Sequence, residues 1–227
     1  FKGVEFQATN SEEAADIRRW IGAGAVVHEV QNLARKAANE SPRTLPKRTG
    51  ELRLVSLARI AAEKNTLFAI ERLQQVRGRV RFDLYGTIYD RSYHEQCLQA
   101  MAHLPPEVVV QWHGQLPNEQ APAAIAAAHF LYMPSVGENF RHTMREALTA
   151  GRPMIISDRT PWKGLATAHA GWDLPLEDPG RFTTVLQAAV DMDQQAYDRL
   201  AQGAYAMGSR YLNNPDPMER SYRMFRP

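Results

Sequence analysis

Hydrophobic positions along the chain fall into short runs that alternate with amphipathic segments. Five strand-like runs occur, at residues 52–58, 80–86, 108–114, 129–135 and 153–157. Helix-like segments lie between them, at residues 65–75, 91–103, 118–128 and 140–150, and two or three more helices are predicted after residue 179. Strands and helices that alternate at this spacing predict a parallel sheet with helices on both faces. Right-handed crossovers make such a sheet doubly wound, so the predicted fold is an α/β, Rossmann-like domain with extra C-terminal helices.

A separate strand–helix–strand pattern occupies residues 4–31. Two extended segments, VEFQA and AVVHEV, flank a helical segment for which Asn10 and Glu13 are spaced as a capping box. Gly22 and Gly24 follow this helix, whereas a dinucleotide-binding fingerprint needs its glycines between a strand and the helix that follows it. We therefore discard a dinucleotide-binding motif here.

The stretch between the two patterns is basic and poor in apolar residues. It carries the cations Arg35, Lys36, Arg43, Lys47 and Arg48, together with two prolines. This composition favours a solvated linker over a patch that binds phosphate or membrane. We divide the chain into residues 1–32, a linker at 33–51 and a main domain at 52–227.

Composition narrows the class of protein. The 227 residues are 44% hydrophobic and 23% charged, as in ordinary globular proteins. No apolar run approaches the roughly 18 residues of a membrane helix, and a single cysteine suits a reducing cytoplasm. The formal charge of +2 is too small to indicate a nucleic-acid partner. Because the chain begins at Phe1 rather than methionine, we expect a piece of a longer cytoplasmic protein.

Two cations follow the first strand of the main domain. In the segment ARIAAEKN, Arg59 lies at the end of the strand and Lys64 lies just before the next helix. Ligands of open parallel sheets bind at the carboxyl ends of the strands, and a helix N-terminus favours anions. The pair is consistent with an anion site and equally with two surface cations.

Two glutamates eight positions apart surround the start of a later helix. The apolar stripe of this helix consists of Phe140, Met144, Ala147 and Leu148. Glu146 lies off the stripe, on the face shared with His142, and Glu138 precedes the first turn. Each acid alone would be a cap or a solvated side chain. Together, across from Arg59 and Lys64, they suit a ligand with a diphosphate and several hydroxyl groups.

Other chemistries have weaker signals. The segment around Ser135 lacks the first glycine of a nucleophile elbow, which argues against a serine hydrolase. The seven histidines and Cys97 show no metal-ligand spacing, so no metal site is expected. Trp112 and Trp162 are interpreted as packing residues rather than base-stacking platforms.

With these residues in place, the chain resembles the carboxyl-terminal, donor-binding domain of a family 4 (group 1) retaining glycosyltransferase of the GT-B fold. The most specific element is the E-x7-E motif from Glu138 to Glu146, and the second is the pair Arg59 and Lys64. The resemblance covers residues 52–227. Residues 1–32 resemble the last strand–helix–strand of the preceding acceptor-side domain, so the rest of that N-terminal domain is an expected partner.

The resemblance implies a role for each position. Arg59, Lys64 and Glu138 would form the catalytic set, with the cations on the donor diphosphate and Glu138 near the reacting carbon of the sugar. Glu146 would hold the ribose hydroxyls, and Gly114 would let the chain pass close to the base. The residues expected to approach the sugar and phosphates at the start of the helix are Phe140, Arg141, His142 and Thr143.

The implied reaction is transfer of a sugar from a nucleotide sugar to a glycan or lipid-linked acceptor, with retention of configuration and without a cofactor or metal. Such enzymes (EC 2.4) act in polysaccharide or lipopolysaccharide biosynthesis, in the cytoplasm and at the inner face of the membrane. The basic linker and the tail arginines suit membrane contact or solvation, and solvation is favoured. We expect this piece alone to turn over little or no substrate.

Two departures from the family pattern leave other interpretations open. Arg141 stands where glycine is usual, and the segment DRTPWKGL replaces a glycine-rich turn, so donor identity is not predicted. A nucleotide-sugar epimerase of the same architecture is one alternative. A non-catalytic interaction domain with a decayed nucleotide pocket is the other, and the retained acids and cations argue against it.

Overall fold

The computed structural model describes residues 3–8, 11–30, 45–137 and 142–213. The chain divides into two compact units, one formed by residues 1–39 with 210–227 and the other by residues 40–209. Each unit is described by itself.

The smaller unit contains the predicted strand–helix–strand. β1 (Glu5–Ala8) and β2 (Val26–Glu29) pair in parallel, and α1 (Ser11–Ile21) connects them. The Gln7 side chain donates a hydrogen bond to the carbonyl oxygen of Val30, just beyond the second strand. The pattern of residues 4–31 is therefore confirmed, while Asn10 of the expected capping box lies outside the described residues.

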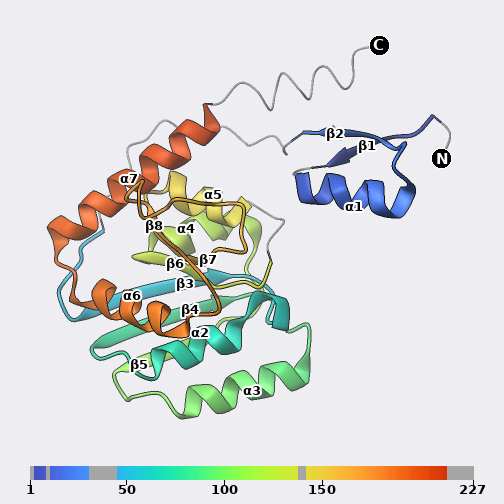
Figure 1. Ribbon diagram of the computed structural model, residues 1–227. Helices are drawn as coiled ribbons and strands as arrows, with labels where there is room; N and C mark the ends of the chain where they lie inside the picture. Colours follow the sequence, from blue (N-terminus) through green and yellow to red (C-terminus); the bar gives the residue numbers. More distant parts are fainter. Residues whose placement is uncertain (1–2, 9–10, 31–44, 138–141, 214–227) are drawn as a thin grey trace. The chain divides into compact units, whose positions relative to one another are not determined.

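The larger unit is built on a six-stranded parallel sheet with the strand order β5-β4-β3-β6-β7-β8 (Figure 1). The strands are β3 (Glu51–Leu57), β4 (Arg79–Tyr85), β5 (Val108–Trp112), β6 (Phe130–Met133), β7 (Met154–Ser157) and β8 (Gly171–Leu174). The five predicted strands are confirmed with small shifts at their ends. The strand order reverses between β3 and β6, and this is the position at which doubly wound sheets bind ligands.

β8 was not expected from the sequence. The strand has only four residues, two of them buried, so it shows neither a long apolar run nor a clear alternation. It pairs with β7 through a glycine with φ of +122°, at which a Cβ atom would lie 1.9 Å from the Met154 carbonyl oxygen. β8 therefore depends on the close approach of two backbone segments at Gly171, which has no Cβ atom. The hydrophobic pattern that usually indicates a strand is missing from its sequence.

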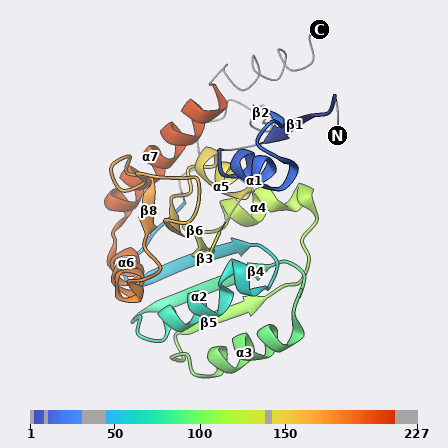
Figure 2. The same ribbon diagram turned by 45° about the vertical axis from the view of Figure 1, so that its right-hand side comes forward.

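Helices cover both faces of the sheet (Figures 1 and 2). One face carries α2 (Thr66–Leu73), α3 (Arg91–Ala102) and α6 (Pro179–Asp191), and the other carries α4 (Ala121–Ala126) and α5 (His142–Thr149). α7 (Gln194–Leu212) follows α6. Short 3-10 turns, η1 (Ala62–Lys64) and η2 (Asn118–Gln120), precede α2 and α4, which makes both helices shorter than predicted. The doubly wound α/β prediction is thus confirmed.

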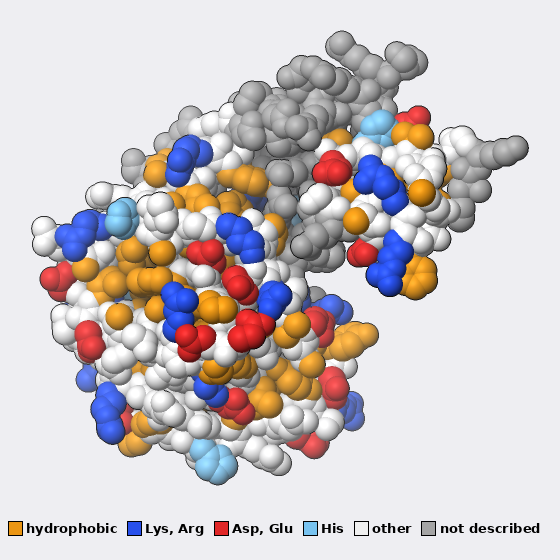
Figure 3. Space-filling model, viewed as in Figure 1, with side chains coloured by type: hydrophobic (Ala, Val, Ile, Leu, Met, Phe, Trp, Pro, Cys, Tyr) orange, Lys and Arg blue, Asp and Glu red, His pale blue; other side chains and the backbone are white. Residues whose placement is uncertain are grey.

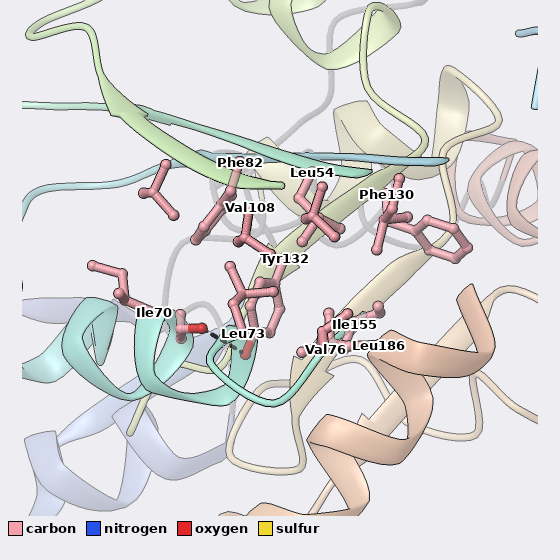
Figure 4. Close-up of a cluster of buried hydrophobic side chains, with 14 of the residues drawn as sticks. Leu54, Ile70, Leu73, Val76, Phe82, Val108, Phe130, Tyr132, Ile155 and Leu186 are labelled. Atoms are coloured by element: carbon pink, nitrogen blue, oxygen red, sulfur yellow. Dashed lines mark hydrogen bonds between the residues drawn. The ribbon is translucent and has the colours of Figure 1, made fainter. Parts of the chain in front are cut away.

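The main core lies between the sheet and helices α2 and α6 (Figure 4). Its labelled strand residues include Leu54, Phe82 and Tyr132, and Ile70 and Leu186 meet them from the helices. All five side chains are buried, and burial of this kind contributes about 1.5–3 kcal/mol for each large apolar side chain. This rigid layer holds the carboxyl ends of the strands in register.

One residue of the basic stretch before β3 is not solvated, which corrects the expectation for Lys47. Its side chain is 4% exposed, and its ammonium group donates to the carbonyl oxygens of Arg48, Val190 and Met192. Val190 and Met192 lie at the end of α6, where carbonyl groups lack partners within the helix and the dipole favours a cation. Burial lowers the pKa of Lys47, and the negative charges of Glu51, Asp191 and Asp193 oppose this shift.

His129 links the amino ends of β3 and β6. Its Nδ1 atom accepts a hydrogen bond from the Arg53 backbone N–H at 3.0 Å, and its Nε2 atom lies 3.0 Å from the Pro46 carbonyl oxygen. This arrangement requires the neutral ring with the proton on Nε2. Burial lowers the pKa of His129 to about 4. The buried ring is therefore neutral at physiological pH.

Acidification is expected to destabilise the protein through His129. Its folded pKa lies below the ordinary value of about 6.5, so the unfolded chain binds the proton more readily between these values. The free energy of unfolding should therefore fall by about 2 kcal/mol between pH 7 and pH 5 from this residue alone. Urea denaturation of wild type and His129→Gln at both pH values measures the contribution.

The expected result is a smaller fall with pH in His129→Gln than in wild type. His103→Gln, at the exposed end of α3, should keep the dependence of the wild type. Equal pH dependence in wild type and His129→Gln would contradict the assignment.

Candidate functional site

The candidate site is the junction of two loops at the carboxyl end of the sheet. Residues 58–65 follow β3 and residues 134–137 follow β6, the two strands at which the strand order reverses. The Val136 N–H donates to the Glu63 carbonyl oxygen at 2.9 Å, and the Asn65 side-chain amide donates to the Pro134 carbonyl oxygen at 3.0 Å. The structure thus places the loop of the two predicted cations beside the loop that leads towards α5.

Arg59 is half-exposed at this junction, with 51% of its side chain accessible. Its guanidinium donates to a Glu63 carboxylate oxygen at 2.9 Å and lies 4.8 Å from the centroid of the Tyr89 ring. The Tyr89 N–H donates to the Ile60 carbonyl oxygen, which fixes the loop after β4 beside the loop after β3. Glu63 and Tyr89 were not singled out in the sequence, although the spacing of four residues between Arg59 and Glu63 is a usable signal for the ion pair.

Lys64 ends η1 and is half-buried. The prediction that the following helix offers its free N–H groups to an anion needs a correction. The Leu67 N–H, in the first turn of α2, donates to the Tyr93 hydroxyl oxygen at 2.9 Å. Burial raises the pKa of Tyr93 to about 12, which keeps the hydroxyl neutral. At least one N–H group at this helix end is therefore bonded within the protein rather than open to a ligand.

The described part of the E-x7-E segment begins at His142. Of the predicted stripe, Met144, Ala147 and Leu148 are fully buried, which confirms the orientation of α5. Glu146 and Thr143 are half-buried and His142 is exposed. Three predicted site residues lie outside the described residues: Glu138, Phe140 and Arg141. The buried Arg145 is a polar member of the packed face that the sequence pattern did not indicate.

Gly114 follows β5 and has φ of +77°. Its carbonyl oxygen accepts a hydrogen bond from the Gly86 N–H at 2.8 Å, which joins the ends of β4 and β5. The Trp112 indole N–H donates to the Gly86 carbonyl oxygen at 2.9 Å, but the residue is 37% exposed, so its interpretation as a packing residue stays a prediction. The chain thus has a left-handed backbone at Gly114, and the contact of this residue with a base stays a prediction.

A polar network on the open side of β4 and β5 was not predicted. The Asp83 carboxylate lies 2.6 Å from His113 Nε2 and accepts from the Arg81 guanidinium at 2.8 Å. Burial pushes the pKa of Asp83 upwards, but Arg81 and His113 hold it below its ordinary value. The His113 ring also stacks on Tyr85, with ring centroids 4.7 Å apart. This network braces the strand that precedes Gly114.

The loop after β7 is closely packed. The Ser157 hydroxyl donates to the Ser135 carbonyl oxygen, which joins the ends of β7 and β6. The Gly164 and Leu165 N–H groups donate to the Asp173 carboxylate on β8. Ser135 is 0% exposed, so it is not placed to act as an accessible nucleophile.

Other classes of site are not seen among residues 3–8, 11–30, 45–137 and 142–213. No group of His, Cys, Asp or Glu side chains in these ranges could hold a metal ion. Burial raises the pKa of Cys97 to about 11, which disfavours a reactive thiolate. None of the described helices is both long and apolar enough to cross a membrane. On the face shown in Figure 3, described cationic and acidic side chains are interspersed.

A family model described as "Glycosyl transferases group 1" matches residues 51–191, more than half of the chain. The chain belongs to the group 1 glycosyltransferases. The matched range contains the whole sheet, the loop junction and the E-x7-E segment. Among curated proteins, no match is found.

Solved structures show that this glycosyltransferase has the fold of one half of a GT-B enzyme. An S. aureus TarM structure with UDP matches with a TM-score of 0.75 at 12% identity, over 98% of this chain and 44% of that one. Anabaena HepE, in complex with UDP and glucose, matches with 0.72 at 16%, over 96% and 61%. Sucrose-phosphate synthase from Thermosynechococcus elongatus matches with 0.72 at 19%, over 96% and 57%. The chain thus spans about half the length of these proteins.

Gly86 is expected to be indispensable for the loop that carries Arg59 of this glycosyltransferase. A Cβ atom there would lie 2.0 Å from the Ala58 carbonyl oxygen, and φ is +148°. Gly86→Ala should lower the free energy of unfolding by about 2–4 kcal/mol, because the backbone before Arg59 must move. Chemical denaturation measures the change.

Gly180→Ala is the matched control. Gly180 lies in the first turn of α6, and a Cβ atom there would meet only the Asp178 carboxylate, at an ordinary 3.5 Å. This variant should be as stable as wild type or up to about 1 kcal/mol more stable. Equal stabilities of the two variants would refute the close approach at Gly86.

Proposed function

We propose that this chain is the donor-binding half of a retaining glycosyltransferase, which binds a nucleotide sugar for transfer to a glycan or lipid-linked acceptor. The observation that carries the proposal is the hydrogen-bonded junction of the loops after β3 and β6. It sets Arg59 and Lys64 beside the loop that runs towards Glu138, at the point where the strand order reverses. Ligands of doubly wound sheets bind in this crevice.

The two cations suit the diphosphate of the donor. Negative charge grows on the departing nucleoside diphosphate as the sugar bond breaks, and positioned cations stabilise that charge. Arg59 is accessible and its exposed ion pair with Glu63 is weak, so a phosphate oxygen can replace the carboxylate at little cost. Lys64 adds a second positive charge from the same loop. Stabilisation of the diphosphate by these two side chains needs no metal ion.

The acids and small residues suit the sugar rings and the base. Carboxylates accept hydrogen bonds from hydroxyl groups, so we assign Glu146 to the ribose and Glu138 to the donor sugar. The start of α5, with Phe140, Arg141, His142 and Thr143, is assigned to the sugar and phosphates. The tight turn at Gly114 is assigned to the base.

UDP is the first nucleotide to test. The similar TarM and HepE structures are complexes with UDP, so UDP is the first probe. An acceptor-side domain of the longer enzyme would complete the cleft, so binding rather than turnover is the appropriate measurement for this chain. Action in the cytoplasm, on acceptors of the inner membrane face, belongs to the same proposal.

A nucleoside diphosphate is expected to stabilise the wild-type fold. At ten times its dissociation constant it would add about 1.4 kcal/mol, which raises the melting temperature by roughly 3–5 °C. A thermal-shift panel of UDP, GDP and ADP, with and without their sugars, measures the effect and identifies the base. Arg59→Ala, Lys64→Ala and Glu146→Ala should each remove most of the shift.

Arg77→Ala provides the control, because Arg77 is an exposed cation just before β4, at the opposite end of the sheet. This variant should retain the full shift. The absence of any shift with millimolar nucleotide in folded wild type would sink the proposal. Conversion of a free nucleotide sugar without acceptor would instead support an epimerase.

A further inference from the structure

Asn65 occupies the N-cap position of α2 without capping the helix. Asparagine is favoured at this position because its side-chain oxygen usually accepts a backbone N–H of the first turn. Here the side chain makes no such bond, and the backbone has the left-handed φ of 57°. The side chain of Asn65 is therefore available for another contact.

The helix end has a substitute for the missing cap. The Tyr93 hydroxyl, on α3, accepts the Leu67 N–H at 2.9 Å. This N–H is one of the two that an asparagine cap would ordinarily bind. The packing of α3 against α2 brings Tyr93 to this position. Helix capping, which is the usual reason for an asparagine at an N-cap, therefore does not explain Asn65.

The Asn65 amide instead reaches across the topological switch point. Its Nδ2 atom donates to the Pro134 carbonyl oxygen at 3.0 Å, between segments 69 positions apart in the sequence. Beside it, the Val136 N–H donates to the Glu63 carbonyl oxygen at 2.9 Å. These two bonds join the loops after β3 and β6 directly.

The loop after β6 is also held on its other side. The Ser157 hydroxyl donates to the Ser135 carbonyl oxygen from the end of β7. Consecutive carbonyl groups of this loop, at Pro134 and Ser135, are therefore bound by side chains from opposite neighbours. Of the two, only the Asn65 contact ties the loop to the segment that carries Lys64.

We infer that Asn65 is a positioning residue of the donor site, which sets the spacing between Lys64 and the chain that leads to Glu138. The inference rests on the proposed function, which assigns Lys64 and Glu138 to the same ligand. The position has two requirements, a left-handed backbone and a short side-chain donor. Glycine satisfies only the first, aspartate tolerates the backbone but cannot donate, and asparagine satisfies both.

The test compares Asn65→Gly and Asn65→Asp with wild type. Both changes preserve the backbone conformation and remove the donor to Pro134. We expect the affinity for UDP, measured by calorimetry well below the melting temperature, to fall about five- to tenfold in each variant. Hydrogen exchange of the peptide that contains Val136 should be faster by a similar factor in the absence of nucleotide.

Gln75→Gly is the matched control. It removes an exposed side-chain amide just beyond the end of α2 and should leave both UDP affinity and exchange at Val136 unchanged. A purely structural role for Asn65 would lower the melting temperature while the affinity of the folded variant stays that of wild type. Such a result, or unaltered exchange at Val136 in both variants, overturns the inference.

The two proposals fail in different ways. If wild type binds UDP and the Asn65 variants bind it within twofold of wild type, the positioning role alone is wrong. If wild type binds none of UDP, GDP and ADP, the donor site itself is wrong and the positioning role falls with it. The exchange measurement then shows separately whether the Asn65 contact holds the loop.

Discussion

The reversal of strand order between β3 and β6 is the constraint on which the rest of the site depends. From β3 the chain crosses to α2 on one face of the sheet, and from β6 it crosses to α5 on the other face (Figure 2). Two neighbouring strands thus send their loops in opposite directions, which opens a crevice between them. Hydrogen bonds from Asn65 and Val136 hold the two loops together where they diverge. The spacing of the loops after β3 and β6 therefore depends on one backbone–backbone hydrogen bond and on one made by the Asn65 side chain.

The contacts that hold the Arg59 guanidinium at the loop junction are weak, so another anion can replace the Glu63 carboxylate. The guanidinium of Arg59 is held by an exposed carboxylate and an aromatic ring, contacts worth about 1 kcal/mol or less each. A diphosphate offers more negative charge and several acceptor oxygens, so it competes well for the same cation. In this structure Glu63 holds the guanidinium beside the loop that follows β3. The helix behind it contributes less than expected, because Tyr93 has already taken the Leu67 N–H.

Much of the fold was predictable from local patterns, and the failures share one physical origin. β6 and β7 are apolar runs buried at every position, and β4 and β5 alternate buried with more exposed positions, so the sequence alone indicated these strands. β8 depends on close approach at Gly171, Lys47 on the distant end of α6, and Asn65 on a carbonyl of another loop. Each of these is a contact between segments far apart in the chain, which no local pattern encodes. The roles assigned to all of the site residues stay predictions, and Glu138, Phe140 and Arg141 also lie outside the described part.

The two ends of the sheet use buried polar groups for different purposes. At the amino end, neutral His129 and buried Lys47 form hydrogen bonds with backbone groups of neighbouring segments, so both serve stability. At the carboxyl end, polar side chains fasten loops and leave Arg59 accessible. Protonation of His129 would disrupt a hydrogen-bond pair at the amino end, on the far side of the core from the loop junction. Acid should therefore lower the population of folded molecules before it alters the geometry of the donor site in those that remain folded, and stability and affinity can be measured as separate functions of pH.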